Sequence, residues 1–259
     1  MSRPANWKNY EDFAAGIDAN RLPTTDALVG QSLELNFGGS RLALQFLTPD
    51  QLRWSAGGQG GTDWYEAILV APDTYFLDLT FKSRPREAAT LIVNTASRQV
   101  LSVRSIARET PVAGLPLVEQ VFEVGVVGNV PVAPAVMTPH PTRDLIGLRA
   151  FYRYSPNHLY EHTYLSSERY AWQCLVGEQR GHGDVDLAST YKFAEDQYLF
   201  TFREFKIPVA SVFFLNFGDL RSTGKFLGLT GDGAVKNNPA GAFIQRASMT
   251  FYDTGAAPV

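Results

Sequence analysis

The sequence predicts an all-β protein made of two tandem antiparallel β-barrels that follow a short N-terminal helical arm. Short apolar runs alternate with Gly, Pro, Asn and Asp at hairpin-like intervals, without helical segments between them. The pattern of apolar, turn and aromatic residues over 28–54 recurs over 145–172, which indicates an internal duplication. A proline-dense stretch over 129–141 predicts an extended connector between the copies, because proline is excluded from central strands.

These observations divide the 259 residues into four segments, long enough together for two barrels that each bury a core. We expect a helical arm at 1–26, a first barrel at 27–130, a linker at 131–141 and a second barrel at 142–259. In the arm, Trp7, Tyr10, Phe13 and Ala14 recur at helical spacing before Pro23. This segment is predicted to form a short amphipathic helix that acts as a lid or a packing arm.

Strands are predicted wherever a short run is rich in β-branched, aliphatic or aromatic residues. In the first unit the runs are SLELNF, RLALQFL, EAILVA, TYFLDLTF, ATLIVNT and QVLSVRSIA. In the second unit they are AFYRYS, LYEHTYLS, RYAWQCLVG, ASTYKFA, QYLFTFREF, ASVFFLNF, KFLGLTG and AFIQRASMTFYD. The eight or so antiparallel strands of the second unit favour up-and-down closure, which leaves an interior able to hold one small ligand.

Charge and cysteine content exclude several classes of function. The 23 Lys and Arg residues nearly balance 26 Asp and Glu residues, with no basic run that would bind nucleic acid or an anionic membrane. The single cysteine, Cys174, cannot form an internal disulfide, and no Cys/His spacing is typical of zinc. Neither a signal peptide nor a long apolar span occurs, so we expect a soluble, cytoplasmic protein.

A pair of tyrosines marks the second unit as the candidate for chemistry. Tyr152 and Tyr154 lie on one face of a predicted strand, where the first unit has leucines at Leu33 and Leu35. If that face is the barrel interior, the two hydroxyls form donors suited to a carboxylate or a phenolate. The alternative, equally weighted, is that both are amphipathic strand residues with solvated tips.

Glu204 is the second candidate. Tyr198, Phe200, Phe202 and Glu204 share one side of a strand in the absence of a bulge, and a carboxyl on an aromatic row is poorly hydrated. Its pKa should rise, which would make it a proton donor or base near neutrality. The alternative is a carboxylate that faces water or pairs with a neighbouring Lys or Arg.

The glycine-rich segment LVGEQRGHGDVD supplies Arg180 and His182, either of which could direct a cation toward a barrel mouth. Solvation is the commoner state for such side chains. His162 is a weak metal-ligand candidate, since its neighbours form no tight motif, and a core histidine is the favoured interpretation. We therefore expect no metal. The residues expected to bind the substrate are Tyr198, Phe200, Phe202, Trp172 and His162. No GxGxxG, Walker, GxSxG or HExxH motif occurs, and no cofactor is expected.

Over almost its whole length the chain resembles the family of molybdenum cofactor biosynthesis protein F. The resemblance rests on the patterns LVG…W and LIG…YEH-YL…W-C-VG and on the connector. It implies two tandem lipocalin-like (calycin) barrels, and it implies no defined activity.

The second unit also resembles phenolic acid decarboxylase, a single barrel that removes CO₂ from p-hydroxycinnamic acids without a cofactor. LIGLRAFYRYS matches the start of that barrel with its Tyr-x-Tyr pair, and FTFREF…VFFLNF matches the strand with the essential glutamate, here Glu204. The resemblance implies that Tyr152 and Tyr154 hold a substrate oxyanion and that Glu204 transfers a proton. Where that family has an arginine this chain has His182, with Arg180 two residues earlier.

The hypothesis from the sequence is therefore a cofactor-independent carbon–carbon lyase, a decarboxylase of a phenolic, hydroxycinnamic or lignin-derived aromatic acid. The expected partner is that small aromatic acid, and the first barrel would cap the site, widen it or mediate a homodimer. One alternative is a lipocalin-like protein that binds an aromatic or apolar metabolite without turnover. Another is an accessory protein of molybdenum cofactor or amine metabolism.

Overall fold

The computed structural model describes residues 7–129 and 137–259, so the start of the arm and most of the proline-rich linker lie outside the described residues. Contacts divide the chain into two compact units, each built around one barrel. One unit comprises Leu22–Ile106 and Gln120–His140. The other comprises Met1–Arg21, Ala107–Glu119 and Pro141–Val259, so the N-terminal arm groups with the second barrel.

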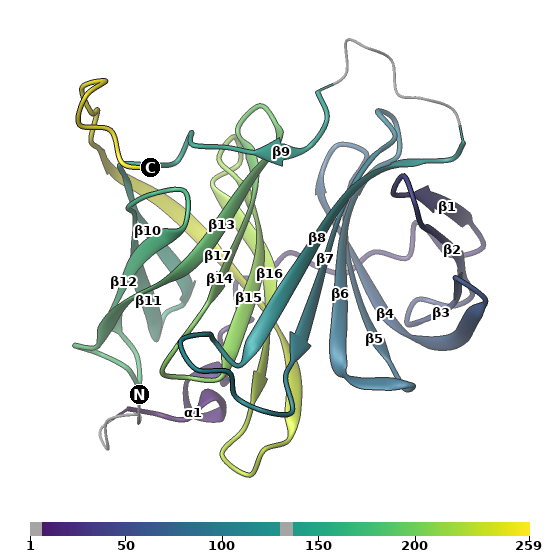
Figure 1. Cartoon of the computed structure of the whole chain (residues 1–259), viewed down its shortest axis with the longest axis horizontal. Coiled ribbons are helices and arrows are strands. Elements are labelled where there is room, and N and C mark those ends of the chain that lie inside the picture. The colour runs from purple at the N-terminus through teal and green to yellow at the C-terminus, as the bar shows by residue number, and fades with distance from the viewer. Residues whose placement is uncertain (1–6, 130–136) are drawn as a thin grey trace. The chain divides into compact units, whose positions relative to one another are not determined.

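The first barrel is a closed antiparallel meander (Figure 1). Its strands are β1 (Ser32–Asn36), β2 (Arg41–Phe46), β3 (Gln51–Ala56), β4 (Gln59–Ala71), β5 (Thr74–Phe81), β6 (Arg84–Asn94), β7 (Gln99–Ala107) and β8 (Val118–Val127). Pairing of β1 with β8, with Leu35 opposite Val127, closes the barrel. The interior is filled by Leu33, Leu35 and other aliphatic and aromatic side chains, as the alternation along each strand requires.

Two strands of this barrel, β3 and β8, lie outside the runs identified in the sequence. β3 places only Leu52 and Trp54 fully inside, and β8 shows no regular alternation of burial. The Gly57–Gly58 pair forms the tight turn between β3 and β4, with φ of +55° and +81°. Such angles favour glycine, and the two glycines form the tip of the hairpin.

The second barrel has the same architecture. Its strands are β10 (Leu148–Ser155), β11 (His158–Tyr164), β12 (Arg169–Val176), β13 (Gly183–Ala194), β14 (Gln197–Arg203), β15 (Val209–Asn216), β16 (Arg221–Leu229) and β17 (Val235–Met249). Pairing of β12 with β13 closes the ring, and the two-residue β9 (His140–Pro141) adds to the edge of β13. The predicted fold class, tandem antiparallel barrels with almost no helix, is confirmed.

The predicted N-terminal helix is present and short. Helix α1 (Tyr10–Ala14) starts at Asn9, whose side chain caps the helix while its backbone N–H donates to Asp12. Tyr10 and Phe13 are buried in the core of the second barrel. Among residues 7–129 and 137–259, no helix has the length and apolar character needed to cross a bilayer.

The duplication is visible in matching hydrogen bonds. The Trp54 indole N–H donates to the Asp63 carboxylate at 2.8 Å, and the Trp172 indole donates to Asp186 at 2.9 Å. Each hairpin before the fifth strand of a barrel also turns on an aspartate with φ of +55°, at 73 and 196. The two units are therefore copies whose residues can be matched one by one.

Candidate active site

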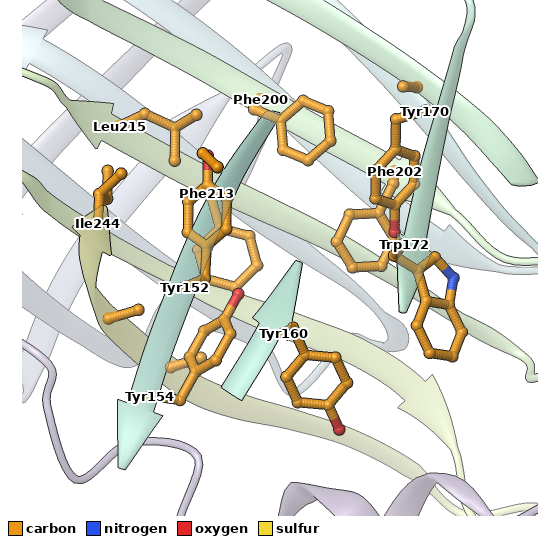
Figure 2. Packing of buried hydrophobic residues seen from close by; sticks show 14 of the residues in the cluster. Tyr152, Tyr154, Tyr160, Tyr170, Trp172, Phe200, Phe202, Phe213, Leu215 and Ile244 are labelled. Atoms are coloured by element: carbon orange, nitrogen blue, oxygen red, sulfur yellow. The ribbon is translucent and has the colours of Figure 1, made fainter. Parts of the chain in front are cut away.

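The second barrel encloses a small cavity of about 30 Å³. Such a volume accommodates one or two water molecules and no aromatic ring. Its polar lining consists of Tyr154, Tyr160, His162, Tyr170, Gln179 and Glu204. Its apolar lining consists of Phe13, Ile17, Trp172, Phe202 and Phe226. Figure 2 shows five of these lining residues on the strands of the second barrel: Tyr154, Tyr160, Tyr170, Trp172 and Phe202.

Glu204 stands at the end of the aromatic row of β14, as the sequence predicted. Tyr198, Phe200 and Phe202 are buried along this strand, and its pairing with β15 has no bulge. Glu204 follows directly and is 6 % exposed, and its Oε2 atom has no hydrogen-bond partner. Burial, reinforced by nearby acidic side chains, raises the pKa of Glu204 well above its usual value. This shift favours the protonated form of the carboxyl group, which is the form that can donate a proton.

The alternative arrangement for Glu204, an ion pair with a neighbouring cation, does not occur. Lys206 pairs with Asp184 at 2.9 Å, and its ammonium group lies 4.4 Å from the ring centre of Trp7. Arg203 donates to the Ser189 hydroxyl at 3.2 Å. Both neighbouring cations are thus engaged elsewhere, and the Glu204 carboxyl lines the cavity.

The two tyrosines of β10 both face the barrel interior, with exposures of 1 % and 2 %. Only Tyr154 lines the cavity. The Tyr152 hydroxyl lies 2.6 Å from that of Tyr164, deeper in the core. Burial raises the pKa of Tyr152 and of Tyr154, so both hydroxyls stay protonated. The pair expected from the sequence is therefore divided between the cavity wall and the packing behind it.

His162 is an aromatic core residue as well as a cavity residue. Its ring centre lies 4.4 Å from that of Tyr152 and 5.2 Å from that of Tyr170, and its Nδ1 atom has no hydrogen-bond partner. Burial lowers the pKa of His162 to about 3, so the ring is neutral. Its close neighbours are rings and not metal ligands, as the favoured interpretation of the sequence held.

The glycine-rich segment between β12 and β13 contributes a different side chain from those expected. Gln179 is buried, and its Oε1 atom accepts a hydrogen bond of 2.8 Å from the Tyr160 hydroxyl. Arg180 is exposed and does not line the cavity. His182 stacks on Trp7, with ring centres 5.3 Å apart. Catalytic roles for Arg180 and His182 stay predictions, since neither side chain reaches the cavity in this arrangement.

Two further predicted binding residues lie away from the cavity. Tyr198 is near the start of β14, where its hydroxyl donates to Asp144 at 3.2 Å beside a separate hollow that includes Phe217 and Arg246. Phe200 packs in the core, with its ring centre 4.9 Å from that of Tyr164. Trp172 and Phe202 do line the cavity.

Several lining residues were not predicted from the sequence, among them Tyr160, Tyr170 and Gln179. Tyr160 and Tyr170 lie in runs already predicted to be strands, LYEHTYLS and RYAWQCLVG. Their alternation with polar neighbours was the signal that could have identified them. Gln179 had no such signal, because its inward direction depends on the conformation of a loop.

The first barrel provides an internal reference for the polar lining. Gly30 N–H donates to the carbonyl of Phe46, and Gly147 N–H donates to that of Tyr164. Counting along the strands from these matched bonds pairs Leu35 with Tyr152. The match made from the sequence, which paired Tyr152 and Tyr154 with Leu33 and Leu35, was therefore wrong by two residues. The same count matches two cavity residues of the second barrel with residues of the first, namely Tyr154 with Phe37 and His162 with Leu44.

Glu204 has an equally clear counterpart. Asp63 accepts a hydrogen bond from the backbone N–H of Lys82, and Asp186 accepts one from that of Phe205. The residue before each of these donors is Phe81 in one barrel and Glu204 in the other. Equivalent interior positions are thus apolar in the first barrel and ionisable or hydroxylated in the second. The common scaffold therefore does not require polar groups at these matched positions.

Asp186 supports the site from behind. Its two oxygens accept hydrogen bonds from the Trp172 indole and from the Phe205 backbone. Burial raises its pKa to about 6, although the indole hydrogen bond opposes the shift. Because Asp63 makes the same two bonds in the first barrel, Asp186 is a structural support for Trp172.

Comparison with known proteins identifies relatives along nearly the whole chain. The model of the MoaF N-terminal domain matches residues 5–109, and that of the MoaF C-terminal domain matches residues 139–250. Protein MoaF of Klebsiella aerogenes is 32% identical over 244 residues, which cover 89% of this chain and 90% of that protein.

A solved structure from Burkholderia vietnamiensis, provisionally described as a beta-lactamase, matches 43% of this chain and 100% of its own. The match has 18% identity and a TM-score of 0.33, which is too weak to indicate a shared activity. The two domain models and the Klebsiella relative agree, and the chain belongs to the MoaF family.

Proposed function

We propose that the second barrel is a cofactor-independent carbon–carbon lyase that decarboxylates a small phenolic acid, with Glu204 as the proton donor. The observation that supports this most directly is the buried carboxyl of Glu204, whose Oε2 atom has no hydrogen-bond partner, at the position where the first barrel has Phe81. Leaving a buried polar group without a partner costs about 1–3 kcal/mol, a cost that a purely structural core would avoid.

The chemistry needs only proton transfer and an electron sink. With a p-hydroxycinnamate, loss of the phenolic proton lets the ring push electrons toward the side chain. The carbon that bears the carboxylate then accepts the proton of Glu204, and the substrate becomes a quinone methide. The bond between this carbon and the carboxylate then breaks and CO₂ leaves. The electron pair of that bond restores the side-chain double bond and the phenolate. Reprotonation of the phenolate and of Glu204 completes the cycle, with a vinylphenol and CO₂ as products.

The neutral lining favours loss of the carboxylate. The described lining residues include no Lys or Arg, and Tyr154 and Tyr170 offer hydroxyl groups as the donors to a bound carboxylate. A carboxylate held by hydroxyls in a water-poor cavity is less stabilised than in water, and this strain is relieved as its charge moves into the aromatic ring. Placement of the carboxylate by Arg180 or His182 would require the glycine-rich loop to move inward.

The test is CO₂ release from a panel of hydroxycinnamic and lignin-derived acids, with cinnamic acid as the matched compound that lacks the electron sink. Glu204→Gln keeps the shape of the side chain and removes the transferable proton, so turnover should fall by at least about 100-fold. Glu109→Gln, at an exposed position of the same unit, should leave turnover unchanged. Absence of CO₂ release from every acid in the panel would exclude the proposed reaction.

A second candidate is a binding protein for a small aromatic metabolite. The small cavity and the absence of a cation among its described lining residues favour this candidate. Tight binding of a phenolic compound without turnover, unaffected by Glu204→Gln, would support it. A role accessory to molybdenum cofactor or amine metabolism follows only from the family name. Growth of a deletion strain on nutrients that require molybdoenzymes tests that role.

A further inference from the structure

Two residues of the N-terminal arm form part of the cavity wall. Phe13, on helix α1, and Ile17, just beyond it, are 3 % and 2 % exposed and both line the cavity. The Phe13 ring packs edge-on against Phe226, with 6.1 Å between centres. The barrel strands alone therefore do not complete the site.

The arm is anchored at Asn20, next to the cavity. Its backbone N–H donates to the carbonyl of Tyr154 at 3.0 Å, and its side-chain amide donates to that of Arg153 at 2.9 Å. Its carbonyl accepts a hydrogen bond of 2.8 Å from Arg221. These bonds tie the arm to the strand that carries Tyr154, so Ile17 has a defined position relative to a cavity hydroxyl.

The other end of the arm is held mainly through side chains. Trp7 stacks on His182 of the glycine-rich loop and lies beneath the Lys206 ammonium group. The Tyr10 hydroxyl donates to the carbonyl of Phe226 at 2.9 Å, and the Glu11 carboxylate accepts from the Gly231 backbone at 3.0 Å. The loop residue His182 therefore holds the arm in place over the cavity.

Between the two anchors the chain turns at Gly16, whose φ is +80°. Any side chain at this position would be strained. Gly16 therefore forms the turn between the helix that carries Phe13 and the segment that is fixed at Asn20. Space for a ligand has to come from the cavity wall, because the present volume of about 30 Å³ is smaller than a benzene ring requires. Phe13 and Ile17 are the two wall residues that do not belong to the barrel.

We infer that Phe13 and Ile17 are specificity-determining residues, whose side chains limit the ligand of this cavity to a single-ring phenol. The inference rests on the proposed site and concerns its ligand class, not its reaction. A single ring can enter when these side chains shift within their packing, whereas a fused second ring needs the volume that the Phe13 side chain occupies.

Binding of 4-ethylphenol and of 2-naphthol, measured by titration calorimetry, tests this without reference to turnover. In Phe13→Ala the affinity for 2-naphthol relative to 4-ethylphenol should rise by at least about 10-fold, the scale of discrimination expected from a change in pocket size. In Phe13→Trp, 4-ethylphenol binding should be lost. Ile17→Ala provides a second truncation if Phe13→Ala does not fold.

Phe193→Ala is the matched control. Phe193 is 1 % exposed and packs on Phe214 with ring centres 6.0 Å apart, but it does not line the cavity. An equal change in the ratio of affinities in this variant and in Phe13→Ala would overturn the inference, because general loosening would then explain both. No binding of either phenol to any variant would also overturn it.

The outcome separates this inference from the proposed reaction. A changed preference for ring size in a protein that releases no CO₂ supports the role of Phe13 and Ile17 and removes only the lyase. CO₂ release together with an unchanged preference supports the lyase and rejects the size limit.

Discussion

Replacing Glu204 with glutamine should stabilise the protein more as the pH increases. The unfolded chain ionises a glutamate near pH 4.3. Burial raises the folded-state pKa of Glu204 well above that, so between the two values the folded state must retain a proton that the unfolded state has released. Over that window wild-type stability falls by about 1.4 kcal/mol per pH unit. Below the unfolded pKa both states are protonated and the carboxyl contributes no pH dependence.

Glutamine cannot ionise, so Glu204→Gln lacks this loss. The difference in unfolding free energy between variant and wild type should therefore be constant below about pH 4 and grow steadily above pH 5. Urea unfolding at several pH values measures it, and subtraction of the two profiles cancels the contributions of all other groups. Hydrogen exchange of β14 and β15 peptides assigns the change to the second barrel. Parallel profiles for Glu204→Gln and wild type from pH 4 to 8 would refute the assignment of a buried, neutral carboxyl.

Three further changes test the packing around the site. Tyr152→Phe should cost about 1–2 kcal/mol of stability, because it leaves the Tyr164 hydroxyl without its 2.6 Å partner. The affinity for phenols should stay within about twofold of wild type. A large loss of binding would show that Tyr152 contacts the ligand. Trp172→Phe and Trp54→Phe each remove an indole bond to a buried carboxylate and should each cost about 1.5–3 kcal/mol in thermal or urea unfolding, whereas a cost in only one barrel would contradict their equivalence. Gly147→Ala should destabilise the second barrel by more than about 1 kcal/mol, since φ is +91° and the added methyl group meets a backbone carbonyl; an unchanged melting temperature would show that the turn can relax.

The fold could be predicted from the alternation of buried and exposed residues along the strands and from the internal duplication of the sequence. Alternation of apolar and polar residues is a local property of a strand, so runs such as SLELNF and AFYRYS identified β1 and β10 correctly. β8 was overlooked because its side chains are mostly half-buried and show no period of two. Interior positions of Tyr152, Tyr154 and Glu204 followed from the same alternation, and the structure confirms their burial.

The alternation of residues along a strand does not indicate which of these interior side chains contact one another. Tyr152 and Tyr154 are two residues apart on one face, and the register places Tyr152 opposite Tyr160. Only the side-chain packing inside the closed barrel decides that the Tyr152 hydroxyl meets that of Tyr164 while Tyr154 lines the cavity. Gln179 enters the cavity while Arg180 remains exposed, a choice made by the backbone of an irregular loop. Such choices depend on contacts between residues distant in sequence.

By itself, the sequence determined the all-β class, the duplication and the barrel whose interior is polar, because strand period and composition are written in adjacent residues. The tertiary structure alone decided that the arm residues Phe13 and Ile17 line the cavity and that the Oε2 atom of Glu204 has no hydrogen-bond partner. Closure of the barrel brings these groups together from segments nearly two hundred residues apart, and no local pattern records that proximity.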